Sequence, residues 1–233
     1  MARYYFIWNG YPSYNRGILL PDAPEIIRPE ERIEHVTIPG RSGELTLTEG
    51  DDIYNSYIQT IPMNIHERSA LKTAEEWLRG DGDVTFSSEP TLKQKARIIN
   101  AVTFRKHSKN LDWWSGDVQF YCDPIKHPVS DSVIEVTSSG ATVNNPGMIK
   151  ALPLIEITGS GLITVTIGGK TISLPNCVSG WVLDCENKWV LQSGIPVAGA
   201  YSGEFPEIPT GNAIVAFTGS VTKLKITPRW RYL

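Results

Sequence analysis

Ile163-Thr-Val-Thr-Ile-Gly168-Gly169-Lys-Thr-Ile-Ser-Leu174 decides the fold of the second half of this 233-residue chain. β-Branched residues alternate with other residues on both sides of a Gly-Gly pair, and glycine reaches φ > 0 without steric cost. Two alternating runs that are separated by two such residues are typical of a β-hairpin with a tight turn. The stretch therefore predicts two paired antiparallel strands.

Around this hairpin, the chain from about residue 130 onward predicts strands throughout. Short apolar runs are separated by turn residues at a spacing that favours a β-sandwich. Two of these runs flank Cys185–Asn187, which predicts a second hairpin. The predicted strands are Val133–Val136, Leu154–Thr158, Leu162–Ile167, Thr171–Leu174, Trp181–Asp184, Trp189–Leu191, Ile214–Phe217 and Val221–Ile226.

The first half predicts an α+β domain that is mostly β with one main helix. Alternating aromatic residues open it and end at the turn dipeptide Asn9-Gly10, which indicates a strand. Between His66 and Leu78, apolar residues recur with the 3.6-residue period of a helix, and Gly80 follows as its stop. Further strands are predicted at Val84–Phe86, Ala96–Phe104 and Asp117–Cys122, the last of them ended by Asp123-Pro124.

A turn in the first half, Pro39-Gly40-Arg41-Ser42-Gly43, is the main candidate for an interaction site. The alternating runs Ile33–Ile38 and Glu44–Thr48 flank it, so a hairpin is predicted through it. Arg41 carries an always-charged, five-donor guanidinium, which suits carboxylates or carbonyls across an interface. Two interpretations remain open: a surface turn that happens to hold an arginine, or a subunit contact.

Composition indicates two domains of ordinary globular character. The first half is rich in charged residues and the second is sparsely charged, a shift that marks a domain boundary. The predicted domains are residues 1–129 and 130–227, with residues 228–233 returning to the first. No apolar run reaches the ~18 residues of a membrane helix, so no membrane anchor is expected. The three cysteines show no CxxC pairing, which disfavours a disulfide framework and a zinc cage.

No catalytic template fits the sequence. Gly169-Lys170-Thr171 resembles the end of a phosphate-binding loop, but Thr164 stands where the first glycine should be. The histidines are isolated from carboxylates and cysteines at metal-ligand spacing. We therefore expect no enzyme, no cofactor and no metal.

Two tryptophans support an alternative function. Trp181 and Trp189 could stack on a sugar ring, because amphipathic aromatic side chains recognise such ligands, or they could pack across a hairpin in the core. The first possibility makes the chain a carbohydrate- or receptor-binding module.

Short motifs follow one another along nearly the whole chain. They are Trp8-Asn9-Gly10 with Ser13, Pro39–Gly43, Trp77-Leu78-Arg79-Gly80, Phe86 with Glu89-Pro90, Phe120–Pro124, Asn145-Pro146-Gly147, Leu152-Pro153 ahead of Gly159–Gly161, Trp181–Asp184, Phe205-Pro206 with Gly211 and Ala213, and Pro228–Arg231. In this order the chain resembles the distal tail protein family of siphovirus-type bacteriophages and prophages.

The resemblance implies a structural hub at the distal end of a virion tail. The N-terminal domain would close into a hexameric ring, and the C-terminal domain would be a galectin-like or carbohydrate-module-like sandwich. The tail tube protein would lie above the ring, with the tail-associated tip protein and receptor-binding or baseplate proteins below. The protein would be made and assembled in the cytoplasm of the bacterial host.

The charge of the chain agrees with such a conduit. DNA would pass through the ring without specific binding, and a strongly basic lining would retain it through phosphate contacts. The net charge of −3 avoids that retention. Within the ring, Arg41 is expected at or near a subunit contact.

Overall fold

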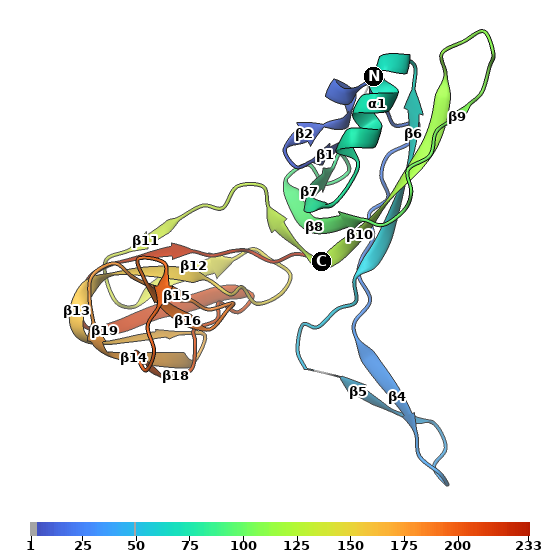
Figure 1. The fold of residues 1–233 in the computed structure, drawn as a ribbon. Coiled ribbons are helices and arrows are strands. Elements are labelled where there is room, and N and C mark those ends of the chain that lie inside the picture. The colour runs from blue at the N-terminus through green and yellow to red at the C-terminus, as the bar shows by residue number, and fades with distance from the viewer. Residues whose placement is uncertain (1–3, 49) are drawn as a thin grey trace. The chain divides into compact units, whose positions relative to one another are not determined.

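The computed structural model describes residues 4–48 and 50–233, and the chain forms two compact units (Figure 1). The first unit runs to Val129 and includes Leu233, and the second spans Ser130–Tyr232. Among the described residues the structure is mostly β with a single α-helix, which confirms the predicted class at that level. The C-terminal segment pairs within the second unit, where the Met148 N–H donates to the Arg231 carbonyl over 3.0 Å.

An eight-stranded antiparallel sheet forms the first unit, in the order β2-β1-β7-β8-β10-β6-β3 with β9 paired to β10, as far as the described residues show. The strands β4 and β5 make a separate two-stranded sheet. The elements are β1 (Phe6–Trp8), β2 (Tyr11–Pro12), the 3-10 helix η1 (Ser13–Arg16), β3 (Ile18–Leu19), β4 (Ile33–Thr37), β5 (Glu44–Thr48), β6 (Tyr57–Ile65), α1 (Arg68–Trp77), β7 (Asp81–Phe86), β8 (Leu92–Ile98), β9 (Arg105–Lys106) and β10 (Trp114–Pro128).

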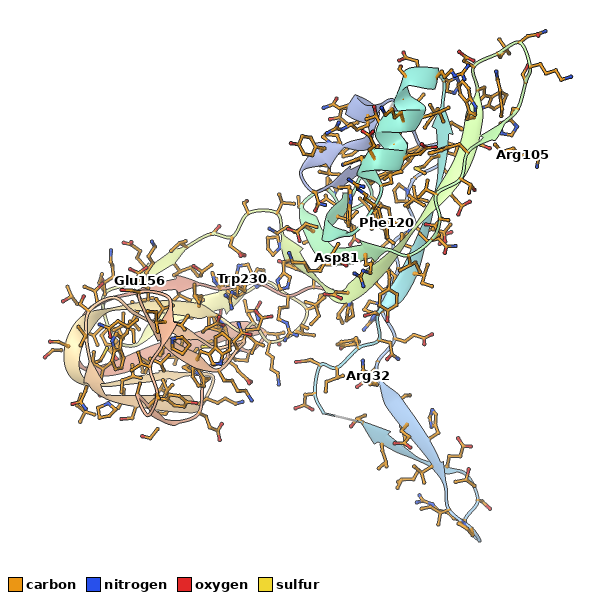
Figure 2. All side chains as sticks on the ribbon, in the orientation of Figure 1. Arg32, Asp81, Arg105, Phe120, Glu156 and Trp230 are labelled. Carbon is orange, nitrogen blue, oxygen red and sulfur yellow. The ribbon has the colours of Figure 1, made fainter. Side chains whose placement is uncertain are left out.

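Helix α1 lies against the sheet and confirms the helix predicted between His66 and Leu78 (Figure 1). Its buried residues Ala70 and Ala74 face the core. Trp77, at its end, stacks on Phe6 with ring centroids 5.6 Å apart. Phe6 also contacts Phe120, which is labelled in Figure 2. Aromatic pairs of this kind contribute beyond the area they bury. The helix therefore covers the apolar face of the sheet.

Two strand predictions in the first unit are wrong in their bounds, and one strand was not predicted. The predicted strand Ala96–Phe104 is instead β8, which ends at Ile98. Strand β10 does not end at Asp123-Pro124 but continues to Pro128 through a register shift between Cys122 and Lys126. A proline is tolerated there because a bulge requires no N–H donor from it. Strand β6 was not predicted, and its alternating Ile61, Met63 and Ile65 are all buried.

The second unit is all-β, with nine strands in one curled antiparallel sheet among the described residues (Figure 1). Its order is β11-β19-β13-β15-β16-β17, with β12 paired to β19 and with β14 joining β13 to β18. The predicted hairpins β13–β14 and β15–β16 are confirmed. The strands are β11 (Ile134–Val136), β12 (Ala141–Asn145), β13 (Leu154–Ile167), β14 (Lys170–Cys177), β15 (Trp181–Asp184), β16 (Trp189–Gln192), β17 (Ile195–Pro196), β18 (Ser202–Gly203) and β19 (Gly211–Thr227).

Two long strands replace four predicted short ones in this unit. Leu154–Ile167 and Gly211–Thr227 pair along nearly their whole length, with register shifts where the sequence indicated breaks. At those shifts the backbones lie so close that a Cβ on Gly159 would be 2.5 Å from the Ser220 carbonyl oxygen. A Cβ on Gly219 would be 2.1 Å from the Leu162 carbonyl oxygen. These glycines permit close strand pairing and do not end the strands.

A charge cluster ties the C-terminal segment to strand β15. Arg229 Nη1 lies 2.8 Å from Asp184 Oδ1 and 3.2 Å from Glu186 Oε2. Burial alone would raise the pKa of Asp184. Hydrogen bonds from Arg229 and Asn187 outweigh burial, and the pKa lies below its usual range. The carboxylate therefore stays ionised and paired at neutral pH.

Candidate interaction surfaces

The hairpin through Pro39–Gly43 forms as predicted. Its strands β4 and β5 are joined in register from Ile33 opposite Thr48 to Thr37 opposite Glu44. We call residues Ile33–Thr48 the arm. Within the part of the chain that the structure describes, the arm strands pair only with each other and contribute no residue to either core.

The two faces of the arm differ in polarity. Directly opposite residues share a face in an antiparallel pair, so Val36 and Leu45 lie on the same face as Leu47. On the other face, His35 Nδ1 is hydrogen-bonded to Thr46 Oγ1 at 3.3 Å. Leu47 is exposed, while Val36 and Leu45 are half-buried. Glu34 is opposite Leu47 and shares that face, and Ile33 lies on the face of His35. One side of the arm is thus mainly apolar and the other mainly polar.

The turn places Arg41 at the tip of the arm. Gly40 and Gly43 both have φ of 81°, a left-handed conformation that glycine adopts without strain. The Arg41 N–H donates to the Ile38 carbonyl over 3.1 Å, which closes the turn. Pro39, Gly40, Arg41, Ser42 and Gly43 are all exposed. The guanidinium of Arg41 is therefore presented on an ordered, solvent-facing turn.

Hydrogen bonds join the two segments of the chain at the base of the arm. The Arg32 N–H donates to the Ile53 carbonyl over 2.9 Å, and the Asn55 N–H donates to the Glu30 carbonyl over 2.8 Å. Arg32 Nε, on the side chain labelled in Figure 2, donates to Asn55 Oδ1 over 3.1 Å. The two segments that connect the arm to the sheet are therefore hydrogen-bonded to each other.

A buried ion pair fixes the segment that leads into the arm. Lys126 is 3% exposed, and its Nζ lies 2.6 Å from Glu89 Oε2 and donates to the Ile27 carbonyl over 3.4 Å. Beside it, the Tyr57 hydroxyl donates to Gln94 Oε1 over 2.9 Å. Burial raises the pKa of Tyr57, so its hydroxyl remains a donor at neutral pH.

The two candidate sugar-stacking tryptophans differ in environment. Trp181 is 5% exposed and belongs to the core of the second unit, so its ring offers little free surface to a ligand. Trp189 is 52% exposed on β16. Trp181 and Trp189 occupy opposite ends of their paired strands, since Trp181 is opposite Gln192 and Trp189 is opposite Asp184. A stacking role is open to Trp189 alone of this pair.

An exposed apolar pair was missed by sequence analysis. Ile58 on β6 lies directly opposite Tyr121 on β10, and both are about half exposed. The signal was the alternation of β6, because side chains point alternately to the two faces of a strand and Ile58 is out of phase with the buried Ile61, Met63 and Ile65. The pair extends the candidate contact surface of the first unit.

Residues 4–48 and 50–233 contain neither a cluster of metal-ligating side chains nor a membrane-spanning helix. No cluster of three or more histidine, cysteine, aspartate or glutamate side chains could hold a metal ion there. No helix in the same ranges is long and apolar enough to cross a membrane.

These features define a class of fold: a helix-covered antiparallel sheet with a separate arm, followed by a curled all-β unit. No protein-family model and no curated protein matches the sequence. Among solved structures, the chain is similar to the Dit protein (gp 19.1) of phage SPP1, described as a paradigm of the hub adsorption apparatus in phages that infect Gram-positive bacteria. The TM-score is 0.79 with 16% identity, and the match covers 100% of each chain. The two proteins share a fold.

Proposed function

We propose that this chain is the distal tail hub of a phage, which assembles as a hexameric ring between the tail tube and the host-adsorption apparatus. The similarity of fold to SPP1 Dit over 100% of both chains carries the proposal. A likeness that spans both units and the arm supports a role for the whole chain, whereas a lone binding module would account for the second unit only. The protein would act as a structural component of the virion tail.

The arm supports a ring. A closed ring needs head-to-tail contacts between two different surfaces of each subunit. A two-stranded hairpin is marginally stable alone in water, and its exposed apolar stripe gains stability when a neighbour covers it. In the ring, the stripe of Val36, Leu45 and Leu47 packs on the next subunit, and Arg41 pairs with carboxylates or carbonyls there.

The second unit projects outward as a galectin-like sandwich in this proposal. Its curled sheet encloses an apolar core, so it holds its own structure while the first unit makes the ring. The tail tube protein binds above the ring, and the tail-associated tip protein and receptor-binding or baseplate proteins bind below. The subunits are made and assembled in the host cytoplasm, and DNA passes through the ring without specific binding.

Light scattering and negative-stain electron microscopy of the purified chain test the ring. We expect a species of six times the 25.9 kDa chain mass and six-fold rings, alone or with the tail tube protein. A chain that stays monomeric at high concentration and with the tube protein present contradicts the proposal.

Paired variants locate the contact on the arm. Leu47→Asp places a charge on the apolar stripe and is expected to abolish rings, while Thr46→Asp makes the same change on the polar face and keeps them. Arg41→Ala should weaken ring formation about tenfold, which corresponds to a loss of about 1.4 kcal/mol and lies above the about 1 kcal/mol that separates contributing from near-neutral interface residues. Arg105→Ala, an exposed arginine on β9, is its control. Equal behaviour of Arg41→Ala and Arg105→Ala removes Arg41 from the contact.

A further inference from the structure

A cavity of about 260 Å³ in the second unit has neither Trp181 nor Trp189 in its lining, although Lys188, the residue before Trp189, does line it. Strand β14 supplies Lys170, and the turn between β15 and β16 supplies Lys188 and the buried Cys185. The segment around β18 supplies the remaining lining residues, which are Tyr201, Gly203, Glu204, Phe205 and Glu207. The cavity is thus built from several strands of one unit.

An aromatic ring forms one wall of this cavity. Tyr201 is 39% exposed, and its ring meets the buried Phe205 edge-on, with centroids 4.8 Å apart at 68°. This contact holds the tyrosine ring in place while leaving part of it open to a ligand. Gly203 keeps the wall close to β14, because a Cβ there would be 2.3 Å from the Thr171 carbonyl oxygen.

The positive and negative side chains in the lining are equal in number. Lys170 Nζ lies 2.7 Å from Glu207 Oε1 and 3.9 Å from Glu204 Oε2. The hydrogen bond to Glu207 raises the pKa of Lys170, so the ammonium stays charged at neutral pH. Lys150 contacts Glu207 from the other side at 3.7 Å. The described lining therefore combines two lysines with two glutamates and has no net charge.

This combination selects the chemistry of a ligand. Lysine only donates hydrogen bonds and an ionised glutamate only accepts them, whereas a sugar hydroxyl does both. Adjacent donors and acceptors therefore satisfy neighbouring hydroxyls of one ring. A phosphate accepts only, and the two carboxylates would repel it. An aromatic wall favours a cyclic ligand with an apolar face.

We propose that this cavity binds one pyranose ring of a neutral saccharide. The C–H face of the sugar stacks on Tyr201. Its hydroxyls donate to Glu204 and Glu207 and accept from Lys170 and Lys188. The volume lies below the about 300–1,000 Å³ typical of drug-sized sites, which limits the ligand to about one ring. The site is independent of ring assembly and adds a glycan contact to the proposed hub.

Protein-observed NMR titration tests the site with glucose, galactose and N-acetylglucosamine as probes. We expect at least one of these pyranoses to shift the amides around Lys170 and Tyr201, with a Kd of about 1 mM. Sorbitol, an open-chain polyol, and glycerol phosphate, an anion, should not shift them. Absence of shifts with all three sugars, or tighter binding of glycerol phosphate, overturns the proposal.

Matched variants separate this cavity from other surfaces. Tyr201→Ala should weaken binding at least about tenfold, a loss comparable to that of a nucleobase stacked on an aromatic side chain. Tyr201→Phe keeps the ring and should stay within about threefold. Trp189→Ala should leave binding unchanged. Because Tyr201 is partly exposed, unchanged thermal unfolding and ring formation show that these variants are intact. Loss of binding in Trp189→Ala but not in Tyr201→Ala contradicts the site and leaves the ring proposal untouched.

Discussion

The β4–β5 and β13–β14 hairpins both join alternating strands through glycines at positive φ, yet their side chains end in opposite surroundings. In β13–β14, Ile163, Val165, Ile167 and Ile172 are fully buried. In the arm, Ile33 and Leu47 are exposed. The local pattern forms the hairpin in both cases, but only tertiary contacts decide whether it becomes core. A well-formed hairpin without its own core is a surface available for another molecule.

The largest expected difference between the hairpins comes from one matched substitution. Ile172→Ala removes a fully buried side chain and should cost about 2–5 kcal/mol of unfolding free energy. Ile33→Ala, at 43% exposure in the arm, should stay within about 0.5 kcal/mol in the unassembled chain. Denaturant unfolding of both variants measures the contrast. Similar losses would mean that the arm is packed as tightly as the core of the second unit.

The second largest difference is expected between the turn glycines of the two hairpins. Gly168→Ala combines a φ of 61° with a Cβ 2.4 Å from the Glu207 carbonyl oxygen, so about 2–4 kcal/mol is expected from strain and overpacking together. At Gly40 φ is 81°, but an added Cβ would have no atom within 4 Å, so Gly40→Ala should cost about 1 kcal/mol of unfolding free energy. Thermal unfolding of the two variants ranks them. A larger loss for Gly40→Ala would show that its turn is constrained by more than its own φ.

Charge pairs should give a smaller, pH-dependent contrast. The pKa of Asp184 is lowered in the folded chain, so its pairing with Arg229 stabilises above about pH 4 and is lost as pH falls through the folded pKa. Arg229→Ala leaves a buried carboxylate and should cost about 1–3 kcal/mol at pH 7, with a flatter acid dependence.

The matched arm variant is Glu44→Gln. It removes the exposed Glu44 carboxylate, whose Oε2 lies 3.9 Å from His35 Nδ1, and should change stability by less than about 0.5 kcal/mol. Unfolding curves at pH 3 and pH 7 distinguish the two pairs. An unchanged acid dependence in Arg229→Ala would refute the assigned role of that arginine.

Local signals in the sequence were sufficient for the hairpins and the helix. The Gly168-Gly169 turn and the Pro39–Gly43 turn need particular backbone conformations, and α1 carries a clear 3.6-residue period. Such features depend on neighbours along the chain, so a sequence pattern predicts them well.

Contacts between distant segments were the part that sequence did not reveal. Gly159 and Gly219 resembled strand ends but lie inside long strands, because their partners come from elsewhere in the chain. Burial separated Trp181 from Trp189 although both sit in similar apolar runs. Tyr201 joins the cavity from a segment without any periodic pattern, so no local signal indicated it.

The three cysteines are poorly reactive groups in this fold. Cys122, Cys177 and Cys185 are buried, and burial raises the pKa of each thiol, that of Cys122 to about 12. The thiolate is the species that reacts with oxidants and disulfides, so the small thiolate fraction near neutral pH slows oxidation and disulfide exchange at all three. A subunit that passes from reducing to oxidising surroundings is therefore slow to form crosslinks through these thiols.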